Sequence, residues 1–163
     1  MFDIEFPDHG PAVTVVIPTK NQAELLKGCV ESLSKTRYAN YEVLIVDNES
    51  DDPRTLEYLS KVSDCPGHRV VSIPNKSGRF SFAALMNSAV RHCETEFVLF
   101  LNNDTEIISE RWLSSMMGYA RMEGVGAVGA RLYFDDRSIQ DAGIVHGYHE
   151  GLASASVCAG GTL

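Results

Sequence analysis

Apolar strand-like runs alternate with segments of helical periodicity along this chain, and that alternation is what most constrains its fold. Val13–Ile17, Tyr41–Val46 and Phe97–Leu101 are short runs rich in β-branched and aliphatic residues. Runs of this kind, bounded by turn residues, are typical of strands buried on both faces. Between them, hydrophobic residues recur with helical spacing, so the pattern favours an α/β protein with a mostly parallel sheet.

The individual elements are bounded by recognisable stop and start signals. Pro18 is expected to end the first strand, because proline has no N–H for a central ladder. Asn21 and Glu24 have the spacing of a capping box, and Asp51 or Asp52 precedes a helix that begins at Pro53. We further expect helices over about 80–92 and after Ser109, and strands over 69–73, 125–134 and 139–146, with a turn at 135–138.

Polar residues gather where the predicted strands end. The clusters are Pro18–Asn21, Asp47–Ser50, Asn75–Arg79 and Asn102–Asp104. Each one alone is typical of a helix cap or an Asx turn. Because ligands of open α/β sheets bind at the carboxyl ends of the strands, four such clusters together indicate a binding site.

Composition and charge exclude several classes of protein. The formal net charge is −8, and no cluster of Lys and Arg is present, so we expect no nucleic-acid partner. No apolar run approaches the roughly 20 residues of a membrane span, and the N-terminus has no basic signal-peptide region. These features predict a cytoplasmic protein, in which the widely spaced cysteines would be reduced thiols.

The residue types in these clusters suit a nucleotide diphosphate. An acidic protein can hold such an anion through Mg²⁺ or Mn²⁺, which binds one or two carboxylates plus phosphate oxygens. Asp104 suits the metal, while Asn102 and Asn103 can bond ribose hydroxyls without adding charge. Asp47 can accept an N–H from a base edge, and the 75–79 segment offers a glycine for close approach and a cation for phosphate.

Four segments of the sequence resemble the family 2 glycosyltransferases of the GT-A fold. They are "VTVVIPTKNQAELLKGCVESL", "YEVLIVDNESDDPRTLEYL", "NKSGRFSFAALMNSAV" and "VLFLNNDTEI", in matching order and spacing. The likeness covers about Val13 to Ile108, and extends more weakly to about residue 147. It implies a Rossmann-like three-layer sandwich with a mostly parallel central sheet, truncated before the acceptor half.

The resemblance also implies roles for single residues. Pro18, Thr19 and Asp47 would line the nucleoside pocket, with Gly78 and Arg79 near the base and ribose. The triplet Asn102, Asn103 and Asp104 stands at the Asp-x-Asp position of the family, with Asp104 as metal ligand and the amides toward the nucleotide. The sequence "VDNES" differs from the commoner Asp-Asp-Gly-Ser form, so the usual contacts are not transferred to Asn48 and Glu49.

The family transfers a sugar with inversion, which requires a general base on the acceptor side. No residue is a convincing base; Glu150 is a weak candidate, and His146 and His149 suit a surface or loop better. The base is therefore expected outside this chain, and the catalytic residue stays unknown.

We expect three segments: a lead-in at 1–12, a donor-nucleotide-binding domain at 13–147, and a flexible or truncated tail at 148–163. The predicted function is metal-assisted transfer of a sugar from a nucleotide diphosphate sugar to a saccharide or lipid-linked acceptor. A UDP- or dTDP-sugar is expected in preference to a GDP-sugar, and a longer protein could associate with the cytoplasmic face of the membrane. The alternative is a non-catalytic nucleotide-sugar-binding module or an incomplete part of a larger synthase.

Overall fold

The structure is a computed structural model that describes residues 4–75, 79–148 and 153–156. The chain divides into two compact units, Met1–Ser114 and Ser115–Leu163, and the division falls within one helix. The first unit contains the sheet and every predicted site residue, so it is described first and by itself.

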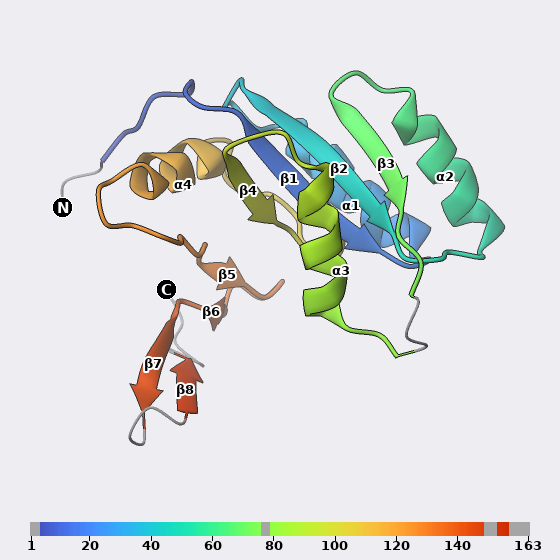
Figure 1. Ribbon diagram of the computed structural model, residues 1–163. Coiled ribbons are helices and arrows are strands. Elements are labelled where there is room, and N and C mark those ends of the chain that lie inside the picture. Colours follow the sequence, from blue (N-terminus) through green and yellow to red (C-terminus); the bar gives the residue numbers. More distant parts are fainter. Residues whose placement is uncertain (1–3, 76–78, 149–152, 157–163) are drawn as a thin grey trace. The chain divides into compact units, whose positions relative to one another are not determined.

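A four-stranded parallel sheet forms the centre of the first unit (Figure 1). Its strands are β1 (Val13–Thr19), β2 (Tyr41–Asp47), β3 (His68–Ser72) and β4 (Phe97–Phe100), in the spatial order β3-β2-β1-β4. The chain order reverses between β1 and β4, which is where doubly wound sheets form their ligand crevice. The parallel α/β fold predicted from the alternating pattern is confirmed.

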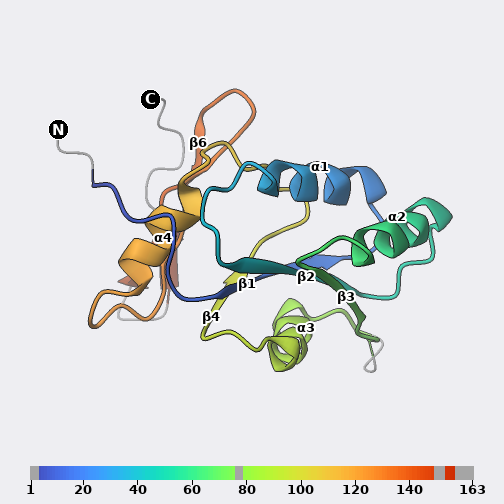
Figure 2. The same cartoon turned by 90° about the horizontal axis from the view of Figure 1, so that it is seen from above.

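Helices cover both faces of this sheet (Figure 2). Helices α1 (Ala23–Leu33) and α2 (Pro53–Ser63) lie on one face, and α3 (Phe82–Ala89) lies on the other. Successive residues of β1 point to opposite faces, so Val15 and Ile17 pack with α1 and α2, whereas Val16 packs with α3. Each fully buried aliphatic side chain of these two clusters contributes about 1.5–3 kcal/mol of transfer free energy.

Pro18 lies inside β1, so the prediction that it ends the strand is wrong. The carbonyl of Val16 accepts the N–H of Leu101 on the β4 side, and the carbonyl of Thr19 accepts the N–H of Asn48 on the β2 side. Because these directions alternate along a strand, the Pro18 nitrogen faces the β4 side, where β4 has already ended. The missing N–H therefore costs no ladder hydrogen bond.

Strand β4 is the edge of the described sheet, which corrects the expectation that it is buried on both faces. Its residues are half-buried, and Phe100 is 50% exposed. Apolar composition could not distinguish an edge strand from a central one, because both carry hydrophobic side chains. Leu101, the next residue, is buried, so the polar triplet begins directly after a core position.

The helices begin close to their predicted positions. Helix α2 starts at Pro53 as predicted, and within it Leu56 is 46% exposed whereas Thr55 is buried. Helix α3 begins at Phe82 after the Ser81 hydroxyl, which accepts the N–H of Ala84, and it continues as the 3-10 turn η1 (Val90–His92).

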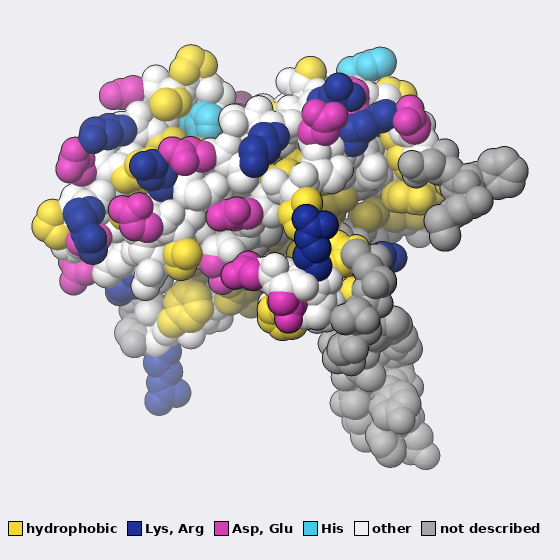
Figure 3. All heavy atoms as spheres, turned by 180° about the vertical axis from the view of Figure 1, so that it is seen from behind, with side chains coloured by type: hydrophobic (Ala, Val, Ile, Leu, Met, Phe, Trp, Pro, Cys, Tyr) yellow, Lys and Arg dark blue, Asp and Glu magenta, His cyan; other side chains and the backbone are white. Residues whose placement is uncertain are grey.

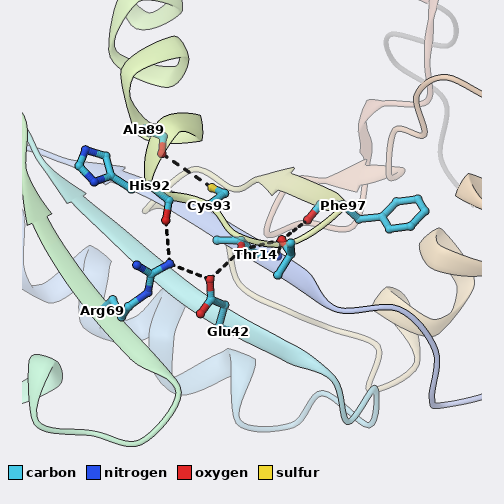
Figure 4. Close-up of polar contacts among 8 residues, drawn as sticks. Thr14, Glu42, Arg69, Ala89, His92, Cys93 and Phe97 are labelled. Carbon is cyan, nitrogen blue, oxygen red and sulfur yellow. Dashed lines mark hydrogen bonds and ion pairs between the residues drawn. The ribbon is translucent and has the colours of Figure 1, made fainter.

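A polar network joins the amino ends of the strands, opposite the predicted site (Figure 4). The Thr14 hydroxyl donates to Glu42 Oε1 (2.8 Å), and the same oxygen accepts from Arg69 Nη2 (2.8 Å). Arg69 Nη2 also donates to the carbonyl of His92 (2.8 Å). The network thus ties β1, β2 and β3 to the end of η1.

The start of α4 (Trp112–Ala120) contacts both the segment before β1 and the segment after α1. Arg111 pairs with Glu5 (2.9 Å) in the segment that precedes β1, and the Ser114 hydroxyl donates to Asp8 (2.7 Å). The Trp112 indole N–H donates to the Thr36 hydroxyl (2.9 Å) after α1. The described part of the expected lead-in is thus held by ion pairs and hydrogen bonds.

The second unit contains two antiparallel pairs: β5 (Leu132–Tyr133) with β6 (Ile139–Asp141), and β7 (Ile144–Tyr148) with β8 (Ala153–Ser156). The turn at 135–138 is confirmed by two backbone hydrogen bonds: the N–H of Phe134 donates to the carbonyl of Ser138 (2.9 Å), and the N–H of Arg137 donates to the carbonyl of Phe134 (2.8 Å). The strand expected over 125–134 is reduced to two residues. The strand expected over 139–146 is divided at Gly143, whose φ of 124° interrupts the ladder.

The last features concern the surface charges, the helices and the thiols. On the face shown in Figure 3, Lys and Arg side chains are interspersed with Asp and Glu. Of the helices in the described part of the chain, none combines the length and hydropathy needed to cross a membrane. Cys29, Cys65 and Cys93 are free thiols.

Candidate functional site

The structure brings three of the predicted polar clusters to one edge of the sheet. Thr19 and Asp47 are register partners at the carboxyl ends of β1 and β2. The Asn103 side-chain amide donates to the Thr19 hydroxyl (3.1 Å), so the triplet after β4 lies beside the end of β1. Asp104 follows directly, at the same edge as Asp47.

The end of β2 is a buried, internally bonded turn. Asp47 is only 7% exposed. Its Oδ1 accepts the N–H of Ser50 (3.1 Å), and the Asn48 amide donates to the carbonyl of Ile73 (2.9 Å). A carboxylate has two oxygens with about four lone-pair sites, so Asp47 has acceptor capacity for a further N–H besides that of Ser50.

Glu49 has a φ of 62°, a left-handed conformation that favours glycine. The commoner form of this motif has glycine at the same place. Here the Glu49 carboxylate accepts the N–H of Asn75 (3.2 Å), which fastens the chain leaving β3 to the end of β2. The contact offsets part of the backbone strain, and it places the start of the 75–79 segment at the same edge.

Asn21 joins the loops after β1 and β2, instead of forming the predicted capping box. Its Oδ1 accepts the N–H groups of Asp51 (3.0 Å) and Asp52 (2.9 Å), and its Nδ2 donates to Asp51 Oδ1 (2.9 Å). Asn21 and Gln22 both adopt left-handed φ values, and the N-cap of α1 is Gln22, without a side-chain cap. Asparagine tolerates this conformation better than most residues.

A cavity of about 310 Å³ is lined by residues from both loops and the helix starts that follow them: Asn21, Gln22, Ala23, Glu24, Asp52 and Arg54. The two loops therefore enclose open space beside the sheet edge.

Helix α1 contacts the segment that carries Asp104. The Cys29 thiol donates to the carbonyl of Asn102 (3.5 Å), and the Ser32 hydroxyl accepts the N–H of Ile107 (3.0 Å). Burial, followed by the nearby charges of Asp104 and Glu106, raises the pKa of the Cys29 thiol to about 12. Cys29 is therefore a neutral thiol at physiological pH.

The side chains at this edge could hold a divalent metal if other ligands complete its coordination shell. Asp104 offers an exposed carboxylate, and among the described residues no group of three or more His, Cys, Asp and Glu side chains could hold a metal ion. A hard cation with one protein carboxylate must complete its shell with water and ligand oxygens. The described residues of this edge thus suit a metal that arrives with a diphosphate.

The structure does not test the predicted roles of Gly78 and Arg79 or of the candidate general bases. Gly78 lies outside the described residues, and Arg79 is exposed in the segment that leads to α3. Of the residues weighed as bases, Glu150 and His149 also lie outside the described part, and His146 is in β7 of the second unit.

Several residues that shape the site were not predicted for their contacts. Ser50 accepts the backbone N–H of Asn21 (2.7 Å), and Cys29 and Ser32 bond to the segment that carries Asp104. A small polar residue at an otherwise apolar helix position, as at Ser32, is the signal that could have identified them.

Comparison with known proteins agrees with this architecture. The model of the family described as "Glycosyl transferase family 2" matches residues 14–149. An uncharacterized protein, y4gI, of Sinorhizobium fredii is 40% identical over 84% of this chain and 15% of its own length. The O-antigen biosynthesis protein RfbC of Myxococcus xanthus is 36% identical over 90% of this chain and 11% of its own length.

Solved structures show the same fold. The mannosyltransferase PcManGT from Pyrobaculum calidifontis, in complex with GDP-Man and Mn²⁺, superposes with a TM-score of 0.68 and 25% identity, over 80% of this chain and 38% of that one. TarS of S. aureus (residues 1–349), in complex with UDP-GlcNAc, gives 0.56 and 26%, over 74% and 37%. The chain spans well under half the length of these relatives. From the extent of the family match, the chain belongs to glycosyl transferase family 2.

Proposed function

We propose that this chain binds a nucleotide diphosphate sugar at the carboxyl edge of its sheet, and that it supplies the donor site of an inverting, metal-assisted sugar transferase. The observation that carries the proposal is the meeting of Thr19, Asp47 and Asn103 at one edge, with Asp104 next in the chain. Family membership and two solved relatives that bind nucleotide sugars support it.

Each residue has a task that its chemistry allows. Asp47 accepts an N–H from the base, while Pro18 and Thr19 line the nucleoside pocket and the amides of Asn102 and Asn103 bond sugar hydroxyls. Asp104 would hold Mg²⁺ or Mn²⁺, which neutralises the charge on the departing diphosphate. Gly78 and Arg79 would contact the base and ribose, and the general base for the acceptor would come from outside this chain.

Thermal unfolding with a panel of nucleotides tests the proposal. UDP, dTDP and GDP are each added with and without Mn²⁺. GDP is included because the two solved relatives bind nucleotides with different bases. A ligand at 100 times its Kd adds about 2.7 kcal/mol to stability, which raises the midpoint by roughly 5–10 °C. We expect the largest shift with UDP or dTDP plus Mn²⁺. No shift with any nucleotide would contradict the proposal.

A measurement of activity separates a transferase from a binding module. If the chain binds nucleotide, sugar transfer or slow hydrolysis of the sugar nucleotide is then measured in this chain and in a longer relative, such as the Myxococcus xanthus protein. Binding without turnover in either protein would favour the non-catalytic module.

A further inference from the structure

Helix α1 holds the segment that carries Asp104 at both of its ends. The segment runs from Asn102 to Ile107, and Asp104 lies in its middle. At the first end, the carbonyl of Asn102 accepts from the Cys29 thiol and from the N–H of Thr105. At the second end, the N–H of Ile107 donates to the Ser32 hydroxyl, and the Ile107 side chain is buried.

Ser32 is the firmer of the two contacts. It is 6% exposed, and its hydroxyl both accepts from Ile107 (3.0 Å) and donates to the carbonyl of Cys29 (2.7 Å). The hydroxyl proton is therefore directed into the helix, which leaves an oxygen lone pair for Ile107. Because this hydrogen bond lies in the core, its loss would leave a buried N–H without a partner.

Cys29 and Ser32 thus both bond to the backbone of this segment. Both are buried residues of α1, about one turn apart, and their bonds go to the backbone of the segment and not to the side chain of Asp104. They can therefore influence the position of Asp104 through the backbone.

We infer that Ser32, assisted by Cys29, is a positioning residue for the metal carboxylate: it fixes the 102–107 segment on α1 so that Asp104 meets the metal and the diphosphate together. The inference rests on the proposed function. A carboxylate that supplies the only firm protein ligand depends strongly on the orientation of its backbone.

The test compares nucleotide affinity with and without Mn²⁺ by calorimetry, in the 163-residue chain and its Ser32→Ala variant. We expect the variant to bind nucleotide without metal as the parent does, and to lose about tenfold of the enhancement that Mn²⁺ gives, in the range of losses typical for residues that orient metal ligands. Ser34→Ala is the matched control, because Ser34 lies near the same helix end and its hydroxyl bonds only to its own turn, at the carbonyl of Glu31.

The outcomes separate the two proposals. A parent without any Mn²⁺ enhancement contradicts the proposed function itself. A parent that shows the enhancement, with a Ser32→Ala variant that keeps it in full, overturns the positioning role. Equal losses with and without metal would also overturn it, because they would show general damage to the fold. If Ser32→Ala does not fold, Ser32→Cys replaces the hydroxyl with a weaker acceptor, and an unchanged enhancement in that variant overturns the inference.

Discussion

Replacing Asn21 with alanine should destabilise the first unit by about 2.5 kcal/mol. The substitution removes three hydrogen bonds to Asp51 and Asp52 at a partly exposed site, worth about 0.5 kcal/mol each at the low end of the usual range. It also places alanine at a φ of 58°, a left-handed conformation that costs about 1 kcal/mol more.

A second substitution separates the two contributions. Asn21→Gly loses the same hydrogen bonds but adopts the left-handed conformation without strain, so it should be about 1 kcal/mol less destabilised than Asn21→Ala. Asn40→Ala is the control, because its exposed side chain makes one hydrogen bond, to the carbonyl of Gly10. We expect the control to change stability by less than about 0.5 kcal/mol.

Urea unfolding followed by the fluorescence of Trp112 is the assay. This is the only tryptophan of the chain, and it packs against the core cluster between the sheet and α1 and α2, so it reports on the first unit. An Asn21→Ala variant within about 0.5 kcal/mol of the parent would refute the loop-bridging role. Equal losses in the alanine and glycine variants would refute the backbone argument.

Three further predictions concern the two ends of the sheet. Burial raises the pKa of Glu42, but hydrogen bonds from Arg69 and Thr14 outweigh it and hold that pKa below its usual value. The ionised carboxylate therefore contributes its full stability above about pH 4.3, and the contribution is lost as the pH falls further. The unfolding curves of the parent and of Glu42→Gln should converge as the pH falls below that value. Thr19→Val leaves the Asn103 amide and the carbonyl of Asn21 without their shared hydroxyl, and should cost about 1–2 kcal/mol by urea unfolding. Asp47→Asn keeps an acceptor for Ser50 and should lower nucleotide affinity by about tenfold or more in calorimetry, with a loss of stability below about 1 kcal/mol; unchanged affinity would exclude the base contact.

The elements that the sequence predicts well are those governed by local chemistry. Pro53 fixes the start of α2 because proline is favoured at the first helical position, and the apolar runs identify β1 and β2 because both strands are buried between helices. Strand β4 has the same composition, yet its exposure depends on whether another strand lies beside it. That neighbour is set by topology, which a local pattern does not contain.

The site also combines features that follow from local sequence with features that depend on contacts between distant residues. Strand-end polar residues predicted the edge at which Thr19, Asp47 and Asn103 meet, because parallel strands place their carboxyl ends together. Asn21 was expected to cap α1, but it bonds to residues 30 and 31 positions away, and its left-handed backbone allows this. Such contacts between distant residues cannot be read from spacing along the chain.

The most direct test of the account is the coupling between metal and nucleotide at Asp104. Calorimetric titration of UDP or dTDP into the parent, with and without Mn²⁺, should show weak affinity for either partner alone and stronger nucleotide binding when both are present, because phosphate oxygens complete the metal shell. Asp104→Asn should abolish that enhancement, while the urea unfolding curve remains that of the parent, since the Asp104 side chain is exposed. An Asp104→Asn variant that retains the full enhancement, or a parent in which Mn²⁺ leaves nucleotide affinity unchanged, would contradict the account.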